Sequence, residues 1–232
     1  MKTAIFIPAY NAEKFLGGVI EKMPRTVAKK DIVVVDDGSK DGTYAAARKL
    51  GVTVIKHVKN RGYGGAQKTA YNYVIKKGYD IVIMVHADGQ HNPLLIPKFV
   101  GLIERGCDAV TGTRFAGTSA VKQGMPLQRY VGNRLLSLFI RIMTGLSVSE
   151  MHNGYRAYKT DALRIVDFNS NSDKYEFDTE ILLLLKAKNM KVGEVPIETI
   201  YKDEESHLNI FAYGSRLVKV VFRYVFLRKY RK

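Results

Sequence analysis

The sequence has little cysteine and no long hydrophobic run, and both absences restrict what the protein can be. The single cysteine, Cys107, excludes an internal disulfide and a cysteine-rich zinc site. No stretch offers the roughly 18 uninterrupted apolar residues that span a bilayer. The apolar run before Pro8 has only about four residues, too short for the core of a signal peptide. We therefore expect neither a spanning helix nor a secretion signal.

The sequence also has too few acidic residues to balance its basic ones, which leaves a net charge of +15. Residues 213–232 contain seven Lys or Arg and no Asp or Glu. Nucleic acid, an anionic membrane surface or a phosphorylated substrate could each attract this charge. No nucleic-acid-binding motif is present, so we expect no nucleic-acid partner.

Hydrophobic periodicity divides the first half of the chain into alternating strands and helices. Short apolar runs predict strands at residues 4–7, 32–35, 52–58, 81–85 and 109–113. Helices are predicted between them at residues 13–27, 43–50, 66–77 and 93–105, the last opened by a proline. This alternation predicts an α/β fold with a mostly parallel sheet and helices on both faces.

The second half of the chain is less regular, but no linker separates it from the first. Helices are expected at 129–144, 177–189 and from 211 onward, and extended segments at 154–158 and 192–200. With 232 residues, the chain suffices for one large domain. We expect residues 1–210 to form that domain and residues 211–232 to form a basic amphipathic helix.

Polar residues follow five of the predicted strands. They are P-A-Y-N at 8–11, D-D-G-S at 36–39, N-R-G at 60–62, H-A-D at 86–88 and G-T-R at 112–114. In open parallel sheets, ligands bind outside the carboxyl ends of the strands. The sequence therefore predicts that these loops share one cleft.

Two adjacent acids, Asp36 and Asp37, end the second predicted strand. Aspartate, glycine and serine form turns readily, and Asp41 could cap the next helix, so a simple turn is one interpretation. Two carboxylates at a buried strand end are costly unless something binds them. The other interpretation is therefore that an aspartate here accepts a hydrogen bond from a nucleobase N–H.

The glycine-rich stretch N-R-G-Y-G-G-A-Q-K at 60–68 does not match the G-x-G-x-x-G dinucleotide pattern, and it follows the third strand rather than the first. It indicates a tight turn that brings backbone amides at a helix N-terminus near a nucleotide or phosphate. Gly65 lies in this turn, and Lys68 in the first helical turn could reach an anion. A plain loop-to-helix turn is the alternative.

The stretch M-V-H-A-D-G-Q-H-N-P at 84–93 places several metal-capable side chains at the end of a buried strand. Asp88 and Gln90 are oxygen donors two residues apart, and His86 lies beside them. The three could bind one cation. A capped strand-to-helix turn is the alternative interpretation.

These motifs, in this order and spacing, resemble glycosyltransferase family 2, and within it the dolichol-phosphate mannosyltransferases and bacterial polyprenyl-phosphate glycosyltransferases. The later segments N-G-Y-R-A-Y, F-D-T-E-I-L and E-V-P-I strengthen the resemblance, which covers about residues 3–206. It implies a Rossmann-like GT-A fold, a nucleotide-sugar donor, Mg²⁺ or Mn²⁺, and inversion at the sugar carbon. It places these residues in the donor site: Pro8, Ala9, Tyr10, Asn11, Asp36, Asp37, Ala87 and Asp88.

The resemblance makes Asp88 the central metal ligand of a D-x-D motif, with Gln90 assisting. The chain departs from the motif at His86, where the family has its first aspartate. Imidazole suits Mn²⁺ better than Mg²⁺, so we hypothesise an altered metal preference. A homologue that binds nucleotide sugar without transferring it is the alternative that His86 leaves open.

The acceptor decides which other residues act. A polyprenyl phosphate is already ionised and needs cationic groups, for which Arg114, Arg129 and Arg134 are the candidates. A saccharide hydroxyl, in polysaccharide or glycolipid synthesis, would need a general base, for which Asp178 or Glu180 is the candidate. For the three arginines, the alternative is a solvated side chain or one that is paired within the protein. In the charged segment 201–209, which could be a lid or a surface loop, Lys202 and His207 are candidate diphosphate contacts.

The main interpretation is a hexosyltransferase that uses a UDP-, GDP- or dTDP-sugar and a polyprenyl phosphate. It predicts a peripheral enzyme on the cytoplasmic face of a membrane. The basic C-terminal helix could bind that surface with its apolar face down, or it could pack on the domain. A membrane-protein partner could also deliver the enzyme to its acceptor.

Overall fold

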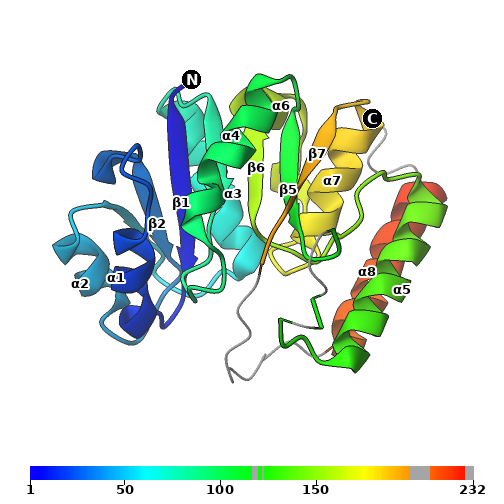
Figure 1. The fold of residues 1–232 in the computed structure, drawn as a ribbon, viewed down its shortest axis with the longest axis horizontal. Helices are drawn as coiled ribbons and strands as arrows, with labels where there is room; N and C mark the ends of the chain where they lie inside the picture. The colour runs from blue at the N-terminus through cyan, green and yellow to red at the C-terminus, as the bar shows by residue number, and fades with distance from the viewer. Residues whose placement is uncertain (117–119, 122, 199–209, 228–232) are drawn as a thin grey trace.

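A computed structural model describes residues 1–116, 120–121, 123–198 and 210–227 of the chain (Figure 1). The strands are β1 (Thr3–Ala9), β2 (Ile32–Asp36), β3 (Thr53–Lys56), β4 (Ile81–Met84), β5 (Ala109–Thr113), β6 (Arg156–Lys159) and β7 (Val192–Pro196). The α-helices are α1 (Glu13–Glu21), α2 (Thr43–Lys49), α3 (Tyr63–Lys76), α4 (Ile96–Glu104), α5 (Leu127–Thr144), α6 (Thr160–Ile165), α7 (Phe177–Ala187) and α8 (Ile210–Val225).

The strands form one sheet in the order β3-β2-β1-β4-β6-β5-β7. β6 runs antiparallel to β4 and β5, and all other neighbouring strands are parallel. The mostly parallel sheet predicted from the sequence is confirmed. β1, β2 and β4 are runs of apolar, largely β-branched residues, as expected for strands that helices cover on both faces.

Two hydrophobic cores lie on opposite faces of this sheet. One contains the inner faces of α1, α2 and α4. The other contains α3, α6 and α7, together with buried residues of α5 and α8. Residues from both halves of the chain share this second core, so the described residues form one domain.

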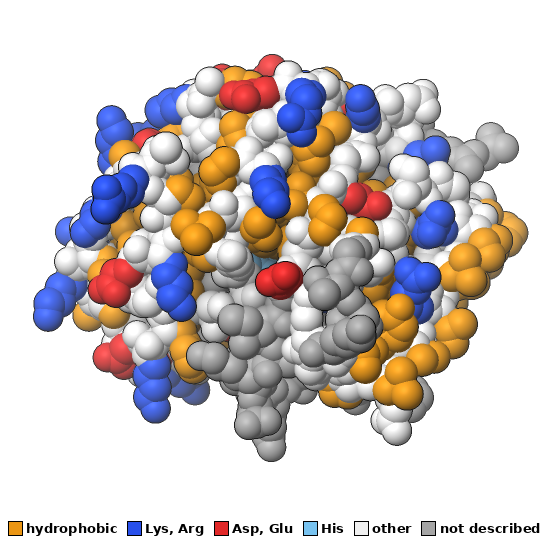
Figure 2. Space-filling model, viewed as in Figure 1, with side chains coloured by type: hydrophobic (Ala, Val, Ile, Leu, Met, Phe, Trp, Pro, Cys, Tyr) orange, Lys and Arg blue, Asp and Glu red, His pale blue; other side chains and the backbone are white. Residues whose placement is uncertain are grey.

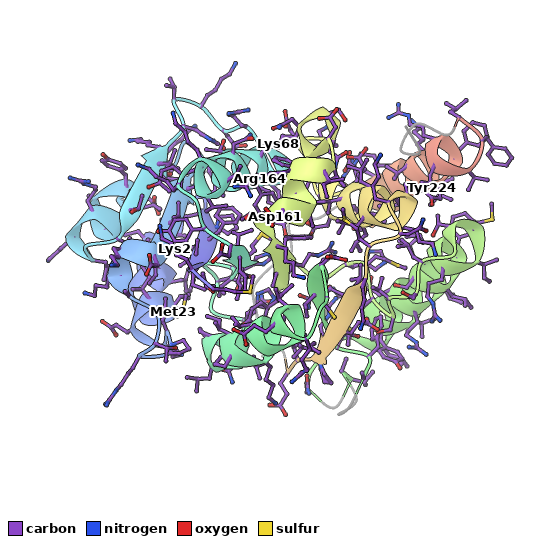
Figure 3. The ribbon with its side chains drawn as sticks, turned by 90° about the horizontal axis from the view of Figure 1, so that it is seen from above. Lys2, Met23, Lys68, Asp161, Arg164 and Tyr224 are labelled. Atoms are coloured by element: carbon purple, nitrogen blue, oxygen red, sulfur yellow. The ribbon has the colours of Figure 1, made fainter. Side chains whose placement is uncertain are left out.

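α8 is part of the domain rather than a separate appendage. Tyr213, Leu217, Val220, Val221 and Tyr224 are buried in the core with α7. α5 and α8 lie side by side at the end of the molecule opposite α1 and α2, in Figure 1 and in the perpendicular view of Figure 3. The predicted boundary at residue 210 is therefore not supported as a structural division.

The helix boundaries differ from the predicted ones where the chain meets proline or a tertiary contact. α1 ends at Glu21 rather than at residue 27, because Pro24 disfavours helical conformation just before it. α3 begins at Tyr63 rather than at residue 66. No helix within the described ranges is long and apolar enough to cross a membrane.

Candidate functional site

The candidate site lies at the sheet edge formed by the carboxyl ends of the parallel strands. β1 connects to β2 on one side, whereas β4 pairs with β1 on the other. The strand order therefore reverses between β1 and β4, and the carboxyl ends of these two paired strands mark the topological switch point, where ligands of such sheets bind. Because these strands are parallel, the loops after β1, β2 and β4 lie at this edge, and they are three of the five loops predicted to share one cleft.

Asp36 and Asp37 have different environments at the end of β2. Both oxygens of Asp37 are occupied: Oδ1 is 2.6 Å from His57 Nδ1 and accepts from the amide of Arg61, and Oδ2 accepts from the amide of Gly62. Asp36 Oδ1 accepts from Ser39, but its buried Oδ2 has no hydrogen-bond partner. Asp36 Oδ2 is therefore the carboxylate oxygen left without a partner in the protein, and Asp37 holds the glycine turn in place. The expectation that the two acids face a nucleoside stays a prediction.

The loop after β1 is fixed to the loop after β2. Asn11 has a φ of 50° and donates its amide to Ser39 Oγ, while its side chain accepts from the amide of Lys40. Ala9 is paired in register with Asp36, which brings the predicted nucleoside residues together. Tyr10 is 48% exposed, so its ring is available at the rim. Pro8 is half-buried in β1.

The backbone amides of the glycine turn before α3 form hydrogen bonds within the protein, so they are not open to a ligand. Gly62 has a φ of 86°, which favours glycine, and the amides of Gly64 and Gly65 donate to the carbonyl of Asp173. Lys68, labelled in Figure 3, donates to Asp173 Oδ1 at 2.8 Å and to the carbonyl of Asn171. The predicted contacts of Gly65 and Lys68 with a nucleotide are therefore not supported, because a segment distant in sequence occupies both groups.

Asp88 and His86 lie together after β4. His86 Nδ1 is 3.8 Å from Asp88 Oδ2, an ion-pair distance rather than a hydrogen bond, and the Gln90 amide donates to Asp88 Oδ1. Burial raises the pKa of Asp88, but His86, His91 and the Gln90 amide together lower it more, to about 2. Asp88 therefore carries an ionised carboxylate at neutral pH, and Ala87 between these residues is buried.

The described residues contain no group of three or more His, Cys, Asp or Glu side chains that could hold a metal alone. Asp88 and His86 can supply at most two ligands to one cation, with the amide oxygen of Gln90 as the predicted third. The diphosphate of a donor and water would have to complete such a coordination shell.

Asp178 belongs to a buried polar network behind His86. It accepts from the Tyr63 hydroxyl at 3.0 Å and from Gln67 at 2.9 Å, and it lies 3.9 Å from the fully buried guanidinium of Arg156. Glu180 is also buried and accepts from the amide of Ser172 at 2.6 Å. Both carboxylates accept hydrogen bonds within the protein, and the role of either acid as general base stays a prediction.

The three arginines predicted to bind an acceptor phosphate have different surroundings. Arg114 is buried, and its guanidinium forms a salt bridge with the buried carboxylate of Glu150. The same carboxylate accepts a hydrogen bond from the backbone amide of Arg114. Its charge is therefore already compensated. Arg129 is half-buried, and the exposed Arg134 places its guanidinium 5.2 Å from the centre of the Phe115 ring. The contact of Arg129 and Arg134 with an acceptor phosphate stays a prediction.

Comparison with known proteins identifies the family. The family model described as glycosyl transferase family 2 matches residues 4–166. The chain belongs to glycosyltransferase family 2. It is 34% identical over 217 residues to the UDP-N-acetylglucosamine–dolichyl-phosphate N-acetylglucosaminyltransferase of Methanococcus voltae, covering 86% of each protein. It is 31% identical over 228 residues to the undecaprenyl-phosphate mannosyltransferase of Micrococcus luteus, covering 95% of this chain and 93% of that protein.

Among solved structures, this family 2 glycosyltransferase resembles the glucosyl-3-phosphoglycerate synthase of Mycobacterium tuberculosis. That structure, a complex with Mn²⁺, UDP and phosphoglyceric acid, matches with a TM-score of 0.72 at 18% identity. The match covers 97% of this chain and 78% of that one. At this identity the likeness concerns the fold, which is the GT-A fold that the sequence predicted.

Several residues that shape this glycosyltransferase site were not singled out from the sequence. The Tyr63 hydroxyl lies 3.1 Å from His86 Nε2, and His57 and Glu150 hold Asp37 and Arg114. A Cβ at Gly154 would overlap His86 Nε2 and the Tyr63 hydroxyl, so only glycine leaves room for both. Tyr63 and Gly154 both lie within motifs that carry the family resemblance, and this was the available signal. Lys202 and His207 lie outside the described residues.

Proposed function

We propose that this family 2 member transfers a hexose, with inversion, from a UDP-, GDP- or dTDP-sugar to a polyprenyl phosphate. The relatives from Methanococcus voltae and Micrococcus luteus, which span nearly the whole chain, are named for transfer to dolichyl and undecaprenyl phosphate. Such an acceptor lies in a membrane, so we further propose a peripheral enzyme at the cytoplasmic face, where the nucleotide-sugar donor is available.

One geometric observation carries the proposal. Asp36, with its unpartnered Oδ2, ends β2, and the ionised Asp88 follows β4, and β1 lies between these two strands. A nucleoside diphosphate laid across the carboxyl end of β1 would place its base N–H near Asp36 and its diphosphate near Asp88. The side chains of Pro8, Tyr10 and Asn11 would line the space between.

The side chains after β4 fit a divalent cation that also binds the nucleotide-sugar substrate. Asp88 supplies an ionised carboxylate, and His86 presents its Nδ1 on the same side. Mn²⁺ accepts both carboxylate and imidazole ligands, whereas Mg²⁺ prefers oxygen, so the pair favours Mn²⁺. When bound, the cation neutralises charge on the departing nucleoside diphosphate. The protein's own contribution is to hold Asp88 ionised and His86 oriented.

The contacts of the acidic residues favour a phosphate acceptor over a hydroxyl acceptor. A phosphate monoester is already ionised near neutral pH, so it attacks without a general base. The two predicted bases, Asp178 and Glu180, are committed to buried hydrogen bonds. Arg129 and Arg134 on α5 can supply the cationic contacts that a phosphate requires.

The test is a transfer assay with the purified full chain. Each of UDP-, GDP- and dTDP-hexoses is incubated with undecaprenyl phosphate or with undecaprenol, with Mn²⁺, with Mg²⁺ or with chelator. We expect one donor class to give a lipid-linked sugar with the phosphate acceptor and none with the alcohol, and chelator to abolish the product. Transfer to a saccharide hydroxyl in place of the lipid phosphate would overturn the acceptor assignment. Donor binding without any transfer would indicate a non-catalytic homologue.

A further inference from the structure

The outer face of α5 carries an exposed apolar stripe. Five large apolar residues recur at spacings of three or four and are between 46% and 73% exposed: Leu127, Val131, Leu135, Leu138 and Ile142. The opposite face of the helix packs inward through Ser137, Ile140 and Thr144. Figure 2 shows hydrophobic side chains gathered at the right-hand side of the molecule, over α5, with Lys and Arg side chains next to them.

α8, which packs beside α5, adds further exposed apolar side chains. Val218 and Phe222 are 49% and 53% exposed, although Leu217, Val220 and Val221 of the same helix are buried. We call the outward apolar residues of the two helices the α5–α8 face: Leu127, Val131, Leu135, Leu138, Ile142, Val218 and Phe222. Monomeric proteins rarely leave so many large apolar side chains together in water, so this face is an interaction surface.

The charge of the two helices indicates the chemistry of the partner. Neither helix contains an Asp or Glu, whereas α5 has Arg129, Arg134 and Arg141 and α8 has Arg216, Lys219 and Arg223. Arg216 is paired with Glu176. Apolar side chains interspersed with basic ones favour an anionic lipid surface, because the apolar groups enter the acyl boundary while the basic groups meet phosphates.

A small cavity in the α5–α8 face is also lined by both basic and apolar side chains. It has a volume of about 130 Å³ and lies between Arg134 and Arg141, and its lining also includes Leu135, Leu138, Ser137 and Ser149. Ser137 is only 2% exposed, and its hydroxyl has no hydrogen-bond partner. Two guanidinium groups and a free hydroxyl beside leucines suit the phosphate of a lipid headgroup whose chains run along the stripe.

A second copy of the chain fits this face less well. In a two-fold symmetric pairing through α5, each residue meets the same surface of its partner. Arg134 and Arg141 would then approach basic residues with no acid from α5 or α8 to pair with them. Like charges without counter-ions oppose such an interface, whereas anionic lipids supply the missing charge.

We propose that the α5–α8 face docks the protein on the surface of an anionic phospholipid bilayer, with a lipid phosphate held at Arg141 in the cavity of this face. The proposal rests on the proposed function for the reason to be at a membrane, and it identifies the docking surface. Figure 1 shows that α5 starts at the same end of the molecule as the carboxyl ends of the parallel strands. Docking along α5 therefore brings the bilayer next to the candidate site. The C-terminal helix contributes Val218 and Phe222 to this surface, whereas its other apolar residues Leu217, Val220 and Val221 are buried in the core.

The first test is flotation of the full chain with vesicles that contain no polyprenyl phosphate. We expect binding to equimolar phosphatidylcholine and phosphatidylglycerol, and about tenfold less to phosphatidylcholine alone. The double variant Leu138→Glu with Ile142→Glu should lose binding, because it places charges in the stripe. Val58→Glu with Ile165→Glu is the matched control, because it adds the same charge at two exposed apolar residues that lie between β3 and α3 and at the end of α6. Equal binding of the double variant and the control would overturn the proposal.

The charge contribution has its own matched pair. Arg141→Glu and Arg48→Glu change the net charge equally, but only Arg141 lines the cavity, and Arg48 lies on α2. Only Arg141→Glu should reduce the preference for anionic vesicles, and free inorganic phosphate should not compete at millimolar concentration. An equal effect of the two variants, or a stripe-dependent dimer in light scattering without vesicle binding, would overturn the proposal.

Vesicle binding and sugar transfer can fail separately. The single variant Ile142→Glu, eight residues along α5 from Arg134, should keep its turnover with a short-chain, water-soluble prenyl phosphate while losing vesicle binding. Vesicle binding through the stripe without transfer to any polyprenyl phosphate would support the docking surface and overturn the proposed function. Transfer to a polyprenyl phosphate by a chain that does not bind anionic vesicles would support the proposed function and overturn the docking surface.

Discussion

The Tyr63 hydroxyl lies 3.1 Å from Nε2 of His86 and donates to Asp178, so a buried carboxylate is linked to the metal-capable histidine through one tyrosine. Burial and the charge of Asp178 raise the pKa of Tyr63 well above its usual value. The hydroxyl therefore stays protonated at any physiological pH. It holds the histidine ring with one nitrogen turned toward Asp88.

Removing the Tyr63 hydroxyl should destabilise the fold and weaken metal binding. Tyr63→Phe leaves Asp178 Oδ2 and His86 Nε2 without that partner, and we expect a loss of about 1–3 kcal/mol of unfolding free energy. The concentration of Mn²⁺ for half-maximal activity should rise about tenfold, because the histidine loses its orienting contact. Thermal melts and metal titrations measure both. Tyr175→Phe, in the exposed ring that stacks on Tyr63, is the control and should change neither.

Asp36 and Asp37 should separate into a binding residue and a structural one. Asp36→Asn places an amide where the free carboxylate oxygen stood, and we expect nucleotide affinity to fall about tenfold by calorimetry. Its melting temperature should change little. Asp37→Asn should instead lower the melting temperature, because Asp37 accepts from His57 and from two backbone amides. Undiminished nucleotide affinity in Asp36→Asn would remove Asp36 from the donor site.

His86 should set the preference among metals. We expect the natural chain to have higher kcat/KM with Mn²⁺ than with Mg²⁺, and His86→Asp to move the ratio toward Mg²⁺, since it replaces imidazole with a second carboxylate. His86→Asn keeps the size of aspartate without its charge and serves as the control. The hypothesis fails if the ratio of the two metals is the same in the natural chain and in His86→Asp.

His152 should make the fold sensitive to acid. Burial, with the charges of Arg114 and Arg156, lowers the pKa of His152 from 6.5 to about 3. The folded state thus keeps His152 neutral while the unfolded chain takes up a proton. The stabilisation is complete above about pH 6.5 and is lost as the pH falls toward about 3, by up to about 1.4 kcal/mol per pH unit.

Urea denaturation at a series of pH values measures this dependence. His152→Phe keeps a ring beside Tyr213 but cannot titrate, so its unfolding free energy should fall less steeply with acid than that of the natural chain. Parallel curves for the two proteins would show that His152 titrates alike in the folded and unfolded states.

The sequence predicts the first half of the fold well because the information there is local. Runs such as Ile32–Val35 are apolar throughout, and the turn residues after them mark where each strand ends. Parallel strands then bring Asp36 and Asp88 to one edge by topology alone. The positions of these two residues could therefore be predicted without knowledge of contacts between distant parts of the chain.

The roles of Lys68, Arg114 and Asp178 could not be predicted in the same way. Each is a charged residue in a motif that resembles a ligand site, but its partner is distant in the chain. Lys68 meets Asp173, Arg114 meets Glu150, and Asp178 meets Tyr63 and Gln67. Nothing local distinguishes a charge that awaits a substrate from one that a later segment of the same protein neutralises.

The position of β5 in the sheet affects how the chain is made. β5 lies between β6 and β7, and both of these strands are synthesised after it. While the protein emerges from the ribosome, both edges of β5 lack neighbours, and the second edge is covered only once Pro196 has left the exit tunnel. Open strand edges can recruit other chains, so both edges of β5 are exposed to wrong pairing until the two later strands are in place.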